Sequence, residues 1–104
     1  MKQVMVRYKV RADRVDENAE LVRAVYEELE SVAPEGFQYA TFRLDDGQTF
    51  VHLALGGTRD APLPQLEAFR RFQERLSERV LEGPVVTEIS QIGSYRLVDE
   101  GSAA

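Results

Sequence analysis

Residues 37–55 read FQYATFRLDDGQTFVHLAL, two β-rich runs that flank Asp46-Gly47. Asp-Gly between two such runs is a strong signal for a tight β-hairpin. A two-residue turn at this point would pair Asp45 with Gln48, and the rest of the pairing follows by counting outward. The predicted strands cover residues 37–44 and 48–55.

This register divides the hairpin into two faces. The first is apolar and suits packing beneath amphipathic helices; it carries Ala40, Phe42, Leu44, Thr49, Val51 and Leu53. The second is mixed; it carries Tyr39, Thr41, Arg43, Phe50, His52 and Ala54. Aromatic side chains bury about 150–250 Å² each. If the mixed face were open to solvent, its exposed apolar area would be larger than that of the apolar patches that monomers usually expose. We therefore expect a second copy of the sheet to cover the mixed face around a two-fold axis.

Outside the hairpin, the hydrophobic pattern predicts two more strands and two helices. The expected elements are a strand over residues 3–10, a helix over 16–33, a helix over 63–81 and a strand over 85–92. Asp16 is a plausible N-cap of the first helix. Gly83-Pro84 is expected to end the second helix.

The resulting β-α-β-β-α-β order predicts an α+β domain of ferredoxin-like topology. Such a domain has a four-stranded antiparallel sheet with both helices on one face. Two sheets meeting in a homodimer would close into an α/β barrel. We expect one domain over residues 1–98 and a disordered C-terminal tail over residues 99–104.

Composition narrows the classes of function. The chain has 104 residues, of which 43% are hydrophobic, and a net charge of −5. A net acidic chain without a basic stripe argues against binding to nucleic acid. There is no cysteine, which excludes disulfides, thiolate nucleophiles and Cys-ligated metals. Charges interrupt the N-terminal segment, so no signal peptide or membrane span is expected, and the cytoplasm is the default compartment.

Several short motifs accompany this element order. They are Pro34-Glu35-Gly36, Arg43-Leu44-Asp45-Asp46-Gly47 with Phe50-Val51-His52, Leu63-Pro64, Ala68-Phe69-Arg70-Arg71-Phe72-Gln73 and Ile92-Gly93-Ser94-Tyr95-Arg96. In this combination the chain resembles the antibiotic biosynthesis monooxygenase-like proteins of the dimeric α/β-barrel superfamily. The resemblance covers about residues 3–97.

The resemblance implies a homodimer with a ligand pocket between helices and sheet. Among characterised relatives, some oxidise aromatic polyketides with O₂ and neither metal nor flavin, and others bind and degrade haem. Their pockets typically combine Trp with Asn, Tyr, His or Arg. This chain has no Trp, and its single Asn is Asn18.

Three residues are candidates for catalysis: Tyr8, Tyr26 and His52. His52, the only histidine, could act as a base, a proton relay or a haem ligand. The alternative is a hydrogen-bonded residue in the dimer core, opposite Thr41. Tyr8 should point at the helices and Tyr26 borders the helical stripe, so the two could orient a phenolic substrate; ordinary core packing is the alternative.

One further pattern has a simple explanation. Charged residues from Glu67 to Arg79 recur at spacings of three and four, which is typical of a solvated helix face.

The leading hypothesis is cofactor-independent oxidation of an aromatic small molecule, with no cofactor and no metal bound. The rival is a non-catalytic dimer that binds a small ligand or serves in a stress response. Haem binding is a third option.

Overall fold

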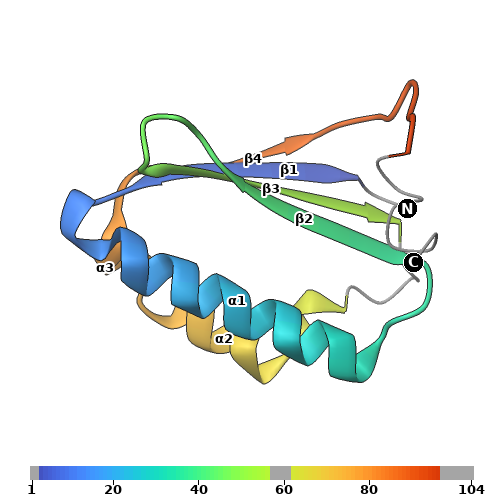
Figure 1. Cartoon of the computed structure of the whole chain (residues 1–104), viewed down its shortest axis with the longest axis horizontal. Helices are drawn as coiled ribbons and strands as arrows, with labels where there is room; N and C mark the ends of the chain where they lie inside the picture. The colour runs from blue at the N-terminus through green and yellow to red at the C-terminus, as the bar shows by residue number, and fades with distance from the viewer. Residues whose placement is uncertain (1–2, 57–61, 97–104) are drawn as a thin grey trace.

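The computed structural model describes residues 3–56 and 62–96. One antiparallel sheet has the strand order β2-β3-β1-β4, and both main helices lie on one side of it (Figure 1). The strands are β1 (Val4–Val10), β2 (Phe37–Arg43), β3 (Thr49–Gly56) and β4 (Val80–Glu88). The helices are α1 (Val15–Val32), α2 (Glu67–Glu74) and α3 (Leu76–Arg79), with 3₁₀ turns η1 (Ala12–Arg14) and η2 (Leu63–Gln65). The predicted ferredoxin-like α+β fold is confirmed.

The hairpin register is confirmed residue by residue. Thr41 pairs with His52 and Arg43 with Phe50, as the counting predicted. The connection is longer than a two-residue turn, because the ladder closes with the Leu44 amide donating to the Thr49 carbonyl at 2.8 Å. Within it, the Asp46 carboxylate accepts hydrogen bonds from two backbone amides and the Thr49 hydroxyl, which lower its pKa to about 2. The longer connection therefore leaves the predicted residue pairs, and the residues that share each face, unchanged.

The assignment of the two hairpin faces is wrong. The mixed face, with Phe50 and His52 both buried, lies beneath the helices. The apolar face lies on the other side of the sheet, where Phe42 is 44% exposed. The physical reason is that α1 and β1 bring polar partners to the mixed face: Tyr26 bonds Thr41, and Tyr8 bonds His52. The buried His52 and its neighbour Thr41 are therefore hydrogen-bonded within the protein, while Arg43, on the same face, is exposed.

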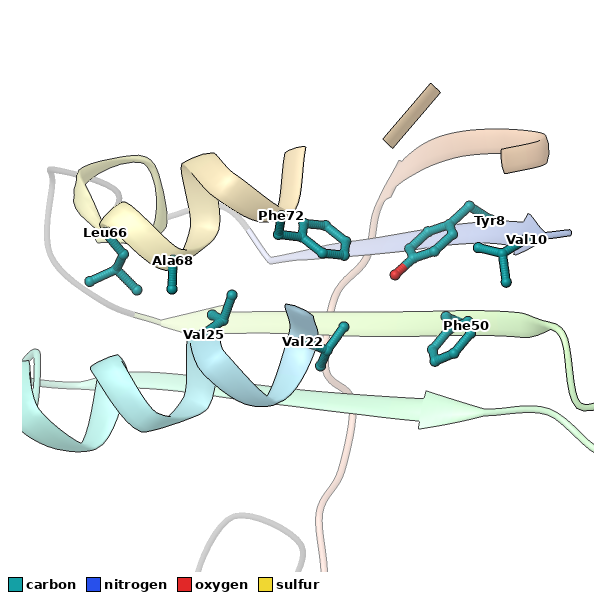
Figure 2. Close-up of a cluster of buried hydrophobic side chains, with 8 residues drawn as sticks. All are labelled: Tyr8, Val10, Val22, Val25, Phe50, Leu66, Ala68 and Phe72. Carbon is teal, nitrogen blue, oxygen red and sulfur yellow. The ribbon is translucent and has the colours of Figure 1, made fainter. Parts of the chain in front are cut away.

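The hydrophobic core lies between this face and the helices (Figure 2). Val22 and Val25 of α1 and Phe72 of α2 pack toward Tyr8 and Phe50 of the sheet. The rings of Tyr8 and Phe50, which are cross-strand partners, stack with centroids 5.7 Å apart. The predicted orientation of Tyr8 toward the helices is thus confirmed.

The second helix differs from the prediction of one helix over residues 63–81. Extended backbone at Leu66 separates η2 from α2, and Arg75 separates α2 from α3. Arg79 turns its guanidinium inward and donates to the carbonyl of Phe72, near the end of α2. An inward donor at this point satisfies a helix-terminal carbonyl and favours ending the helix early.

The last strand runs over Val80–Glu88 and not over residues 85–92, and Gly83-Pro84 lies inside it instead of ending the second helix. The pairing with β1 shifts register here, since Arg7 pairs with Val85 and Lys9 with Glu82. Gly83 has φ of 86°, and a Cβ there would lie 2.7 Å from the Arg7 carbonyl oxygen. Only glycine fits this bulge without strain. Glycine and proline therefore mark a bulge inside β4.

The start of the first helix also differs in detail. The turn η1 runs directly into α1, so Arg14 occupies the N-cap position and Asp16 lies in the first turn. The predicted tail at residues 99–104 lies outside the described residues, and the domain limits remain a prediction. Within the described part of the chain, no helix is long and apolar enough to cross a membrane.

Candidate functional site

A cavity of about 1020 Å³ lies between the sheet and the segment that carries η2 and α2. Its walls are mostly apolar, and they include the aromatic rings of Phe37, Phe69 and Phe72. Tyr8, Tyr39 and His52 line the same cavity and bring polar atoms to it. The cavity is therefore mostly apolar, with a polar region on the sheet and one polar side chain, Gln73, on α2.

The polar region is centred on His52, which is 4% exposed. Its Nε2 atom lies 2.8 Å from the Tyr8 hydroxyl oxygen. Its Nδ1 atom lies 2.8 Å from the Tyr39 hydroxyl oxygen and 2.9 Å from Thr41 Oγ1. Neither nitrogen offers a free lone pair to an iron atom, so His52 in this arrangement does not fit the role of a haem ligand.

Behind Tyr8, a second pair of polar residues extends the hydrogen bonds away from the cavity. Asn18 of α1, which is fully buried, donates from Nδ2 to the Tyr8 hydroxyl oxygen at 3.0 Å. Arg79, 1% exposed, donates from Nε to Asn18 Oδ1 at 3.0 Å, and its guanidinium lies over the Phe72 ring. The buried cation is thus held by an amide, a carbonyl and an aromatic face.

Tyr26 takes a different position from the other two candidates. Its hydroxyl lies 2.7 Å from Thr41 Oγ1, so it reaches His52 only through Thr41. Tyr26 is not among the residues that line the cavity, although its ring stacks on that of Tyr39. The structure therefore brings Tyr8 and His52 into direct contact and leaves Tyr26 one residue away.

Burial sets the protonation states of this cluster. Burial lowers the pKa of His52 to about 4, so the imidazole is neutral at pH 7. Burial raises the pKa of Tyr8 to about 12, and it also raises the pKa of Tyr39 and Tyr26. All three phenols are therefore protonated. Among the described residues, no buried side-chain nitrogen or oxygen lacks a hydrogen-bond partner.

Sequence reasoning missed two members of the cluster as functional groups. The sequence marks Asn18 only as the single asparagine, and the charge spacing assigns Arg79 to a solvated helix face. The contacts of His52 with Thr41 and Tyr39 could be found, because the hairpin register places them opposite and diagonal to it. No sequence signal marks Arg79, since its inward turn depends on the break at Arg75 between α2 and α3.

Comparisons with known proteins address the fold. No family model and no curated protein matches the sequence. Among solved structures, a candidate antibiotic biosynthesis monooxygenase from Nitrosomonas europaea is 16% identical, with a TM-score of 0.73 over 89% of this chain and 100% of its own. A candidate enzyme of the same description from Caulobacter crescentus is 15% identical, with a TM-score of 0.70 over 88% and 90%.

A protein from Mycobacterium tuberculosis gives a similar result. It is 18% identical, with a TM-score of 0.71 over 89% of this chain and 96% of its own. At such identities the likeness establishes the fold. The resemblance that the sequence motifs indicated is therefore confirmed at the level of the fold.

Proposed function

We propose that this chain, which has the fold of the antibiotic biosynthesis monooxygenase-like proteins, oxidises a planar, electron-rich aromatic molecule with O₂ in the cavity. The supporting observation is the joint placement of Tyr8, Tyr39 and His52 on one wall of a mostly apolar chamber. Small-molecule sites usually have volumes of about 300–1,000 Å³ and a few polar groups that orient the ligand. The aromatic walls suit a flat ring system.

The proposed reaction balances without a bound cofactor. In an anthrone-like substrate, one oxygen atom of O₂ replaces the two hydrogens of a reactive CH₂ group and gives a carbonyl. The other oxygen leaves as water with those two hydrogens. The substrate supplies all the electrons after it has lost a proton, so the protein must take up that proton, orient the ring and exclude water.

Tyr8 and His52 are suited to take up the proton together. The Tyr8 oxygen receives the substrate proton while its own proton passes over 2.8 Å to His52 Nε2. Because the pKa of His52 is about 4, charging it at pH 7 costs roughly 4 kcal/mol. The substrate anion formed beside the imidazolium offsets this cost.

Oxygen uptake by purified protein with anthrone-like substrates tests the proposal. We expect uptake above the uncatalysed background, a loss of about 100-fold in kcat for Tyr8→Phe, and no change for Tyr95→Phe. Tyr95 is the matched control because it is 81% exposed. If the protein binds the substrates but consumes no O₂, the non-catalytic ligand-binding function replaces this one.

We also propose that the chain forms a homodimer through the open face of the sheet. That face carries Met5, Ala40, Phe42, Val51, Leu53 and Val85, of which Phe42 is 44% and Val85 59% exposed. In the segment after β4, Ile92 is fully exposed. A second copy would cover both surfaces at once, since a two-fold axis brings identical patches together.

A further inference from the structure

Arg79 determines which atoms donate and which accept in the hydrogen bonds that lead through Asn18 and Tyr8 to His52. A guanidinium can only donate, so Asn18 must present its amide oxygen to Arg79 Nε. The amide nitrogen of Asn18 then faces Tyr8 and donates to the Tyr8 hydroxyl oxygen. The contact with Arg79 therefore determines which end of the Asn18 amide is the oxygen and which is the nitrogen.

The same order of donors and acceptors continues into the imidazole. Tyr8 is 2% exposed, so its hydroxyl hydrogen needs a protein acceptor. Its two partners in the described structure are the Asn18 amide nitrogen, which is a donor, and His52 Nε2. The hydrogen must go to Nε2, which is then an acceptor. In a neutral imidazole the proton consequently lies on Nδ1.

We propose that Arg79 and Asn18 hold His52 as the Nδ1–H tautomer and thereby free the hydroxyl hydrogen of Tyr39 for a ligand oxygen in the cavity. Since Nδ1 then carries the hydrogen, it donates to the hydroxyl oxygens of Tyr39 and Thr41, and the Tyr39 hydroxyl hydrogen has no acceptor on His52. The inference rests on the proposed aromatic ligand and narrows its class. The cavity selects flat ring systems that carry a carbonyl or phenolate oxygen.

In this arrangement Tyr39 donates to the ring oxygen of the ligand, and Arg79 and Asn18 are positioning residues. The opposite tautomer would turn Nδ1 into an acceptor for the hydroxyl groups of Tyr39 and Thr41, and His52 would then compete with the ligand for the Tyr39 hydrogen. Whenever the Tyr39 hydroxyl donated to His52, the polar wall would offer the ligand oxygen no phenolic donor from Tyr39. Specificity for an oxygen-bearing ring therefore depends on residues that do not touch it.

Nitrogen NMR of the wild-type protein tests the tautomer directly, and His52 is the only histidine in the chain. At pH 7 we expect the ¹⁵N shift of Nδ1 to be that of a protonated ring nitrogen and the shift of Nε2 to be that of an unprotonated one. A protonated Nε2 in the wild type would overturn the inference, whatever the protein does with O₂.

Asn18→Asp is the matched variant, because the carboxylate has the shape of the amide but cannot donate. It would accept from both Arg79 and the Tyr8 hydroxyl, so the Tyr8 oxygen would accept from Nε2–H. We expect the two ¹⁵N shifts of His52 to exchange character. A folded Asn18→Asp protein that keeps the Nδ1–H tautomer would contradict the role of Asn18.

Ligand selectivity is tested with anthraquinone-2-sulfonate and anthracene-2-sulfonate, which differ in the ring oxygens. We expect wild type and Tyr95→Phe to bind the quinone several-fold to tenfold more tightly. Tyr39→Phe and Asn18→Asp should abolish this preference while still binding the anthracene. An unchanged preference in Tyr39→Phe would refute the assignment of Tyr39. Because the test measures binding and neither ligand needs to react, it can be interpreted even if the protein is not an oxygenase.

Discussion

The hydroxyl oxygen of Tyr8 on β1 lies 2.8 Å from Nε2 of His52 on β3, and the two rings stack with centroids 5.3 Å apart. This pair joins the core of the sheet to the polar wall of the cavity. It also buries an imidazole whose pKa falls to about 4. Folding therefore depends on keeping His52 neutral, which makes stability sensitive to mildly acidic pH.

We expect the stability of the protein to fall as pH is lowered from about 6.5 to about 4. In this window the unfolded chain protonates His52 while the folded chain does not, so protons favour unfolding. The contribution is fully present above pH 6.5, and roughly 3 kcal/mol is lost by pH 4. Denaturant unfolding at several pH values, with His52→Gln beside wild type, measures it. Equal pH slopes for the two proteins would contradict this prediction.

Glu28 on α1 caps the start of α2. Its carboxylate accepts hydrogen bonds from the backbone amides of Ala68 at 2.8 Å and Glu67 at 3.2 Å. These amides have no partner inside their own helix, so Glu28→Ala should cost about 1 kcal/mol of unfolding free energy. The exposed neighbour Glu27 is the control, and Glu27→Ala should cost much less. Equal losses for the two variants would rule out the cap.

The buried guanidinium of Arg79 should be important for stability. Arg79→Leu removes the donors to Asn18 Oδ1 and the Phe72 carbonyl and leaves both acceptors without that donor. We expect a loss of about 2–4 kcal/mol, because buried polar groups would lose their partners. Arg75→Leu, on the exposed side of the same segment, should change stability little. Thermal unfolding of both variants measures the difference, and similar melting temperatures would argue against a structural role for Arg79.

Phe42→Asp tests the homodimer. Phe42 lies on the open face of the sheet, so a charge there should separate two sheets without disturbing the core beneath the helices. Light scattering should give twice the 11.8 kDa chain mass for wild type and the single chain mass for the variant. A wild-type protein that is monomeric at micromolar concentration would contradict the proposed dimer.

The hairpin shows how far sequence reasoning reaches. Asp46-Gly47 and alternation predict the pairing of Thr41 with His52, because register depends on local turn chemistry. Alternation does not show which face meets the helices, since both faces carry enough apolar area to be buried. The pairing of Tyr8 with Phe50 would have decided it, but contacts between β1 and β3 depend on the tertiary fold.

The sequence predicts only part of the candidate site. Tyr8 and His52 stood out as a phenol facing the helices and a single histidine. Arg79 could not be found, because its charge fits the spacing of a solvated helix and only the break at Arg75 turns it inward. The spacing of charged residues predicts which side chains are exposed only while the helix is regular, and it does not predict exposure beyond a helix break.

Labelling with ¹⁸O₂ tests the central claim most directly. Wild-type protein is incubated with an anthrone-like substrate under labelled oxygen and without added metal or flavin, and the product is analysed by mass spectrometry. We predict that protein-dependent product carries one labelled oxygen atom in its new carbonyl group. Product that forms no faster than in the absence of protein, or that takes this oxygen from water, would contradict the claim.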